Sequence, residues 1–335
     1  MNLLLYGLLF VASVIVTLGA CALFTNAIEW LGKRLNLSEG AVGSVLAAIG
    51  TTLPETSIPI VAIFFGATRE EAEVGLGAIL GAPFMLSTLV IPILAMLLVL
   101  YAGLGKRGGA FRLNYREVSV DLAFFAAAYV VALGCVFAPA SVHIAAAVAL
   151  MAWYLYYVKL KFADTGDAEE GELDELSALF FARRAHTPSY GLIVLQALAG
   201  LGGLVVGAHM FVTAAESAAQ FLSISPLILS LLIAPLATEL PEMSNSFLWL
   251  YQKKDRLAVG NVTGAMVFQG TIPVSVGLLG TEWALASSAR LTMMLAVVAT
   301  LTLLLQSAVG RLWRPWLMSA CALLYIGYAI FLYGL

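Results

Sequence analysis

The chain has 335 residues, of which 61% are hydrophobic and only 11% are charged, and its mean hydropathy is +0.97. Soluble domains carry about 25% charged residues, so this composition excludes an ordinary water-soluble protein. A net charge of -3 and a pI near 5.7 also exclude nucleic acid as a partner. We therefore expect an all-α membrane protein whose surroundings are the lipid bilayer.

Apolar stretches long enough to cross a bilayer recur along the chain, because a spanning helix needs about 20 apolar residues. We predict ten transmembrane helices, at 3–31, 40–65, 75–103, 118–138, 141–160, 190–221, 226–250, 259–280, 288–309 and 314–334. The first is interpreted as a retained span rather than a cleaved signal, because no basic region precedes it.

An acidic segment, 162–188, separates the predicted spans into two groups of five and carries seven acidic residues. Such a run of charge is typical of a solvated connection rather than of a cation sensor. We therefore expect a first five-helix repeat at 1–161, an acidic linker at 162–188 and a second five-helix repeat at 189–335.

Basic residues concentrate on one side of the predicted bilayer. Only Arg69 and Arg290 fall on the opposite side, against Lys33, Arg34, Lys106, Arg107, Arg112, Arg116, Lys159, Lys161, Arg183, Arg184, Lys253, Lys254, Arg256, Arg311 and Arg314. The positive-inside rule then predicts a cytoplasmic linker and both termini outside, in a bacterial or archaeal plasma membrane.

One short motif occurs in both halves. The segment Thr51-Thr52-Leu53-Pro54-Glu55 recurs 187 residues later as Thr238-Glu239-Leu240-Pro241-Glu242. A glutamate within the membrane needs a partner or a water-filled path, so both are candidates for function. The proline before each glutamate predicts a helix break that leaves carbonyl oxygens able to face a cation.

The repeat also predicts the topology of the chain. Five spans per half is an odd number, so the two halves insert in opposite directions and form an inverted repeat. Pairs of interrupted helices in matching halves are typical of secondary transporters, whose binding site lies at the interface between the repeats.

Glu55 and Glu242 are the principal candidates for the site. Two carboxylates in a low dielectric repel one another unless a cation or a proton lies between them. Calcium binds six to eight oxygens, including hydroxyls and carbonyls. Further candidate ligands are the hydroxyls or carbonyls of Thr51 and Thr238 and the carbonyls of Ala47 and Ala234. The alternative is a pair of glutamates that are hydrogen-bonded only to close the helix bundle.

The two Thr-x-Leu-Pro-Glu motifs resemble the alpha repeats of sodium/calcium exchangers, in the cation/calcium exchanger superfamily. The resemblance covers both halves. It implies a ten-helix antiporter with two inverted-topology repeats, in which the paired glutamates bind calcium and sodium in alternation. Carried onto this sequence, it implies a cation site made by Thr51, Glu55, Thr238 and Glu242.

The chain departs from that family pattern in the helix that follows each motif. The family has Gly-Ser-Asn-type segments there, whereas this chain has 81–86 and 264–269, in which only Gln269 keeps a side-chain amide. Ser87 is a nearby replacement hydroxyl. Glu239 is an additional acid where the family pattern has Ser or Thr. These changes favour fewer sodium sites, or a proton as the counter-ion.

The sequence thus predicts a secondary-active antiporter of inorganic cations, exchanging Ca²⁺ for Na⁺ or H⁺, with no cofactor and no obligate protein partner. The alternatives are an exchanger of Mn²⁺ or Mg²⁺ coupled to H⁺, and a cation channel. An intramembrane hydrolase is disfavoured, because no His-Glu-x-x-His motif occurs and the chain has only three histidines.

A second acidic pair, Glu29 and Glu216, follows the same offset of 187 residues. These glutamates could gate access to the site or carry protons. For Glu29, an ordinary helix-surface ion pair with Lys33 is an equal alternative.

Overall fold

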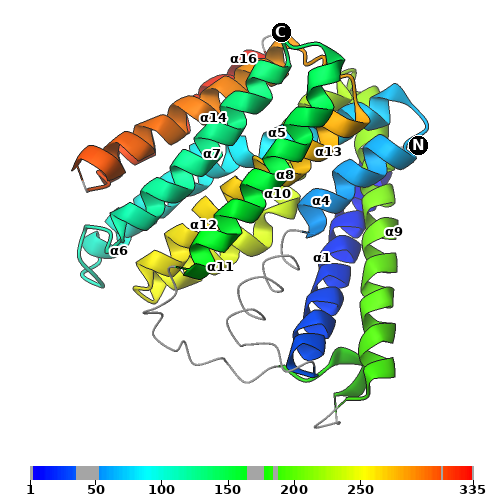
Figure 1. Ribbon diagram of the computed structural model, residues 1–335, viewed down its shortest axis with the longest axis horizontal. Helices are drawn as coiled ribbons and strands as arrows, with labels where there is room; N and C mark the ends of the chain where they lie inside the picture. The colour runs from blue at the N-terminus through cyan, green and yellow to red at the C-terminus, as the bar shows by residue number, and fades with distance from the viewer. Residues whose placement is uncertain (1–2, 35–52, 164–176, 184–187, 311, 334–335) are drawn as a thin grey trace.

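The computed structural model describes residues 3–34, 53–163, 177–183, 188–310 and 312–333, and the regular structure throughout these ranges is helical (Figure 1). The first half contains α1 (Leu3–Arg34), α4 (Leu53–Ile60), η2 (Val61–Phe65), α5 (Arg69–Met85), η3 (Leu86–Val90), α6 (Ile91–Gly103), α7 (Tyr115–Cys135) and α8 (Ala140–Ala163). The second contains η5 (Phe180–Ala182), α9 (Tyr190–Leu222), α10 (Pro226–Thr238), α11 (Leu240–Tyr251), α12 (Asp255–Gln269), α13 (Ile272–Gly280), α14 (Ser287–Leu305), η6 (Gln306–Gly310), α15 (Pro315–Ala320) and α16 (Ala322–Tyr333).

Within the described residues, eight helical segments are long and apolar enough to cross a membrane. The predicted spans 40–65 and 226–250 differ from these, because their described parts contain only the shorter apolar helices Glu55–Phe65 and Pro226–Leu236. An all-helical chain that crosses the membrane several times is therefore confirmed, whereas the count of ten spans stays a prediction.

Two element boundaries differ from the prediction for local reasons. Helix α5 begins at Arg69 rather than at residue 75, because the Thr68 hydroxyl accepts a hydrogen bond from Glu71 N at 3.1 Å and so caps the helix. The predicted span 259–280 is interrupted between α12 and α13, where Pro273 is the second residue of the new helix. The interruption leaves Gln269 as the last residue of α12.

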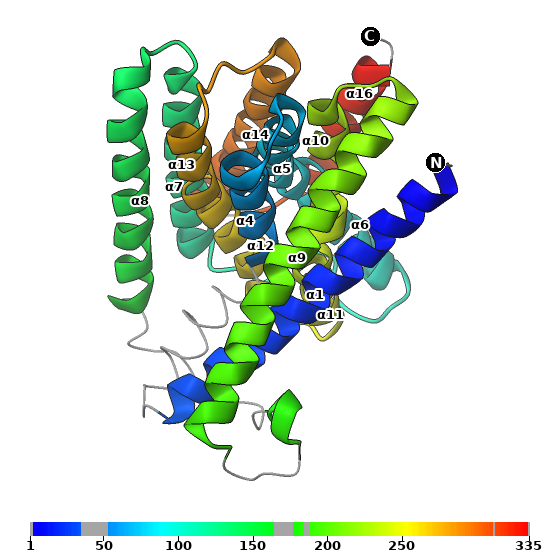
Figure 2. The same cartoon turned by 90° about the vertical axis from the view of Figure 1, so that its right-hand side faces the viewer.

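Helices α1 and α9 run side by side along one side of the molecule (Figure 1 and Figure 2). Glycines on α9 allow the two backbones to approach closely. A Cβ added at Gly200 would lie 2.8 Å from the backbone nitrogen of Phe24, and one at Gly207 would lie 2.9 Å from that of Thr17. Small residues at such contacts are typical of helix packing in membranes.

Most of the other helices share a large apolar core that includes Phe84, Phe125, Tyr129, Trp283 and Trp313, all fully buried. Ile58 of α4 belongs instead to a smaller apolar cluster with Phe211 of α9. Because α5 and η3 cross this core, residues 81–86, in the helix that follows the first motif, are buried. The core therefore gives the candidate site a rigid support.

The described end of the predicted linker is packed rather than solvated. The Ser177 carbonyl accepts hydrogen bonds from Asn26 Nδ2 at 3.2 Å and from Trp30 Nε1 at 3.0 Å, and Leu179 is fully buried. Gln196 of α9 accepts a hydrogen bond from Phe181 N at 2.9 Å. This part of the linker therefore contacts both α1 and α9, and residues 164–176 lie outside the described residues.

Candidate cation site

The second Pro-Glu motif interrupts the helix as the sequence predicts. Helix α10 ends at Thr238 and α11 begins at Leu240, with Glu239 between them at φ -83° and ψ 1°. Pro241 has no N–H, so the carbonyl of Ala237 loses its usual helical donor. At the first motif, α4 begins at Leu53.

Three glutamates meet at these helix ends. Glu55, Glu239 and Glu242 each offer a carboxylate oxygen, and these three oxygens lie within 4.8 Å of one another. The residues are 4%, 0% and 3% exposed, respectively. At 4.8 Å and an effective dielectric constant of about 20, each charged pair repels by roughly 3–4 kcal/mol. All three cannot be charged together unless cations or protons compensate them.

Several buried oxygens of this cluster have no hydrogen-bond partner among the described residues. They are both carboxylate oxygens of Glu55, one of Glu239 and the amide oxygen of Gln269. Gln269 Nε2 donates a hydrogen bond to the other carboxylate oxygen of Glu239. Buried polar atoms are normally paired, so these oxygens form an arrangement that a cation would complete.

Other predicted ligands are placed differently. The Thr238 hydroxyl donates to the Ala234 carbonyl at 3.2 Å, so these two candidate oxygens bond to each other. The Ser87 hydroxyl donates to the carbonyls of its own helix, at 2.8 Å from Pro83 O and 3.1 Å from Phe84 O. Ala47 and Thr51 lie outside the described residues. The ligand roles of these five residues stay predictions.

Two polar contacts that the sequence analysis did not identify hold α11 and its glutamate. Asn261 Nδ2 of α12 donates to the Glu242 carbonyl at 3.2 Å and to Ser246 Oγ at 3.1 Å. Asn261 thus fixes the backbone at Glu242. The amide of Asn261 within a predicted span was the available signal, but its partner depends on how α11 and α12 pack.

A close approach of α5 and α10 also supports the site. A Cβ added at Gly81 would collide with the carbonyl oxygen of Leu231 and lie 2.8 Å from Pro235 Cγ. Pro235 has no N–H, so this carbonyl has no helical donor. Ser230 Oγ donates to the Val74 carbonyl at 2.6 Å in the same contact. The absence of a side chain at Gly81 therefore brings α5 against the helix that leads into Glu239.

Glu216, the described member of the second acidic pair, is not part of this cluster. Glu216 is partly exposed near the end of α9 and accepts a hydrogen bond from Gln220 Nε2 at 3.2 Å. The side chain of Glu29 lies outside the described part of the chain. The roles predicted for this pair stay predictions.

Comparison with known proteins agrees with the motifs. The family model of the sodium/calcium exchanger proteins matches residues 5–163 and 192–334. The antiporter CaxA of Alkalimonas amylolytica is 31% identical over 152 residues, which are 44% of this chain and 47% of the relative. The aligned region thus spans about half the length of that curated relative.

Two solved structures have a similar fold. A crystal structure of the H⁺/Ca²⁺ exchanger CAX has a TM-score of 0.64 at 15% identity, covering 97% of this chain and 87% of the other. The sodium-calcium exchanger NCX_Mj, soaked with Na⁺ and Sr²⁺, has a TM-score of 0.57 at 21% identity, covering 97% of each chain. These likenesses concern the fold alone. With the family match over most of its length, the chain is a multi-pass membrane protein that belongs to the sodium/calcium exchanger family, whose members are secondary transporters and not enzymes.

Proposed function

We propose that this protein is a secondary-active antiporter that exchanges Ca²⁺ for Na⁺ or H⁺ by alternating access. The observation that carries the proposal is the cluster of Glu55, Glu239 and Glu242, buried and within 4.8 Å of one another. Family membership supports cation exchange as the class of activity. The names of the solved relatives, which mention H⁺, Ca²⁺ and Na⁺, support these ions as the first to test.

The donor set suits a hard divalent cation. Carboxylates of the three glutamates and the amide oxygen of Gln269 are oxygen ligands of the kind that calcium binds. We propose that Thr51, Thr238, Ala47, Ala234 and Ser87 supply further oxygens toward the usual six to eight. When the divalent ion leaves, repulsion among the carboxylates favours the entry of Na⁺ or H⁺. That competition for one set of oxygens couples the two fluxes.

The proposed architecture is ten spans in two inverted repeats, at 1–161 and 189–335. The offset of 187 residues between the two motifs supports it. We propose that α1 and α9 move as one unit against the remaining helices, because glycines bring their backbones together. The linker at 162–188 would be cytoplasmic and both termini outside.

The deciding experiment is calcium-45 uptake into proteoliposomes under an imposed outward Na⁺ or proton gradient. The expected result is uptake driven by one of the gradients and lost in Glu55→Gln and Glu242→Gln. The matched control is Glu282→Gln, because Glu282 is an exposed glutamate in the loop before α14. This variant should transport like the parent.

Two outcomes would contradict the proposal. Folded protein that shows no gradient-driven calcium uptake would overturn calcium as the substrate, and the same assay with manganese-54 would then test the Mn²⁺ alternative. Calcium flux that follows its own gradient and needs no counter-ion would instead indicate a channel.

A further inference from the structure

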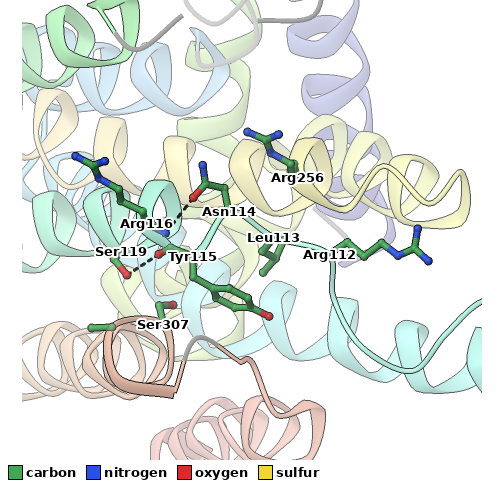
Figure 3. A pocket seen from close by; sticks show the side chains of 9 residues that line it. Arg112, Leu113, Asn114, Tyr115, Arg116, Ser119, Arg256 and Ser307 are labelled. Atoms are coloured by element: carbon green, nitrogen blue, oxygen red, sulfur yellow. Dashed lines mark hydrogen bonds between the residues drawn. The ribbon is translucent and has the colours of Figure 1, made fainter. Parts of the chain in front are cut away.

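The start of α7, the start of α12 and the end of α14 meet at a groove (Figure 3). None of the three glutamates of the carboxylate cluster lines this groove. Its volume is about 720 Å³. The lining includes Arg112 before α7, Arg116 of α7, Arg256 of α12, and Ser307 and Ala308 of η6. Neither the proposed antiport nor the family match assigns a role to this groove.

The ends of two candidate spans place the groove at the boundary of the membrane. One span, Tyr115–Cys135, begins at the groove, and another, Ser287–Val309, ends at it. Leu305, Val309 and Leu312, at this end of α14, are exposed apolar residues. The groove therefore has an apolar approach from the lipid side and lies at the depth where phospholipid headgroups meet acyl chains.

The charges around the groove are unbalanced. Among the described residues around the groove, the nearby acids are Glu117 and Asp255, and Asp255 is already paired with Arg107. The three arginines of the lining therefore carry an excess of two positive charges over Glu117. Glu117 pairs with Arg256 at 2.9 Å, whereas Arg112 and Arg116 are exposed and their guanidinium groups form no ion pair with any described residue. In Figure 3 the side chains of Arg112 and Arg116 extend in opposite directions, and Arg256 lies above Leu113.

The floor of the groove is unsuited to a small anion. The Ser119 hydroxyl donates to the Tyr115 carbonyl at 2.6 Å, and Ser307 Oγ accepts a hydrogen bond from Trp313 Nε1 at 2.6 Å. Both hydroxyls are thus engaged, and the remaining floor includes the side chains of Leu113 and Ala308. An occupant that matches these features has a negative headgroup for the arginines and a hydrocarbon part for the floor.

We propose that this groove binds one anionic phospholipid. Its phosphate would lie over the groove, and the exposed side chains of Arg112 and Arg116 would turn toward it, because guanidinium groups suit phosphate oxygens. The glycerol and the first part of one acyl chain would follow Ala308 toward the exposed apolar residues of α14. A zwitterionic phospholipid leaves the two excess positive charges without compensation, so it binds more weakly.

The test measures thermal unfolding of the purified full chain in neutral detergent micelles while phosphatidylglycerol, phosphatidylcholine or inorganic phosphate is added. Phosphatidylglycerol should raise the unfolding midpoint most. An arginine near an anionic surface contributes roughly fivefold to binding. Arg112→Gln and Arg116→Gln should therefore each raise the half-effective phosphatidylglycerol concentration about fivefold. Ala308→Trp should also raise it, by filling the floor without changing the charge.

The control is Arg290→Gln. Arg290 lies in the first turn of α14, at the opposite end of that helix from the groove, and donates to Ser287 Oγ at 3.0 Å. An equal loss in this variant would indicate general electrostatics and overturn a local site. Equal stabilisation by phosphatidylcholine would overturn the charge argument. Equal stabilisation by inorganic phosphate, unaffected by Ala308→Trp, would indicate a free-anion site and overturn the lipid proposal.

Discussion

Two ion pairs join the segment before and within α7 to the start of α12, and they differ in exposure. Arg107 Nη2 lies 2.6 Å from Asp255 Oδ2, and the two side chains are 6% and 0% exposed. Arg256 Nη2 lies 2.9 Å from Glu117 Oε1, with side chains 64% and 38% exposed. Asp255 and Arg256 are adjacent in sequence, so the two pairs allow a comparison at nearly one location.

Arg107→Met should destabilise the protein far more than Arg256→Gln. Methionine keeps part of the bulk of Arg107 but leaves the Asp255 carboxylate buried. Among the described residues, its remaining hydrogen-bond donor is Arg112 N at 2.8 Å. Removing one partner of a buried ion pair costs about 3–5 kcal/mol, because a charge stays buried without compensation. Removing one partner of an exposed pair costs about 0–1 kcal/mol.

A double variant separates the cost of burying the Asp255 charge from the attraction between Asp255 and Arg107. Arg107→Met combined with Asp255→Leu removes both charges, so it should be more stable than Arg107→Met alone. The free energy of unfolding can be measured in mixed micelles with increasing sodium dodecyl sulfate, followed by tryptophan fluorescence. The reasoning is refuted if Arg107→Met loses no more stability than Arg256→Gln. It is also refuted if the double variant is as unstable as the single one.

Three other substitutions test the support of the site. Gly81→Ala should separate α5 from α10, because its Cβ would collide with the Leu231 carbonyl. The variant should give less folded protein and less calcium uptake than the parent. A folded yield and an uptake equal to those of the parent would contradict this packing. Gly260→Ala is its control, since a Cβ there meets nothing within 4 Å, and it should raise the free energy of unfolding by about 0.4–1 kcal/mol. Gln269→Leu removes both the donor to Glu239 and the amide oxygen proposed as a ligand, so the half-saturating calcium concentration should rise about 10–100-fold. An unchanged value would show that neither the donor nor the oxygen contributes to calcium binding.

The pairing of Glu55 with Glu242 could be predicted from sequence because one physical argument covers both. Each is an acid within an apolar segment, each follows a proline, and both lie at the same place in a repeat. These facts predict proximity without any knowledge of side-chain packing. The cluster of these two residues with Glu239 agrees with that expectation.

The partner of Glu239 could not be predicted in the same way. Gln269 lies 30 residues further along the chain and reaches Glu239 only because α12 packs on α11 and ends there. Hydropathy does not report that end, since the stretches 265–268 and 272–274 on either side of it are apolar and favour one continuous span.

The two halves of the repeat differ in the acidic and amide side chains that they place near the site. By the offset of the motifs, Glu239 corresponds to Thr52, and by the matched segments Gln269 corresponds to Leu86. The second half thus has both an additional acid and the amide that binds it. Glu55, by contrast, has no hydrogen-bond partner for either carboxylate oxygen among the described residues. Under the proposed function, the cation itself holds α4 against the α10–α11 break, and its departure leaves repulsion there that favours a different arrangement of the helices.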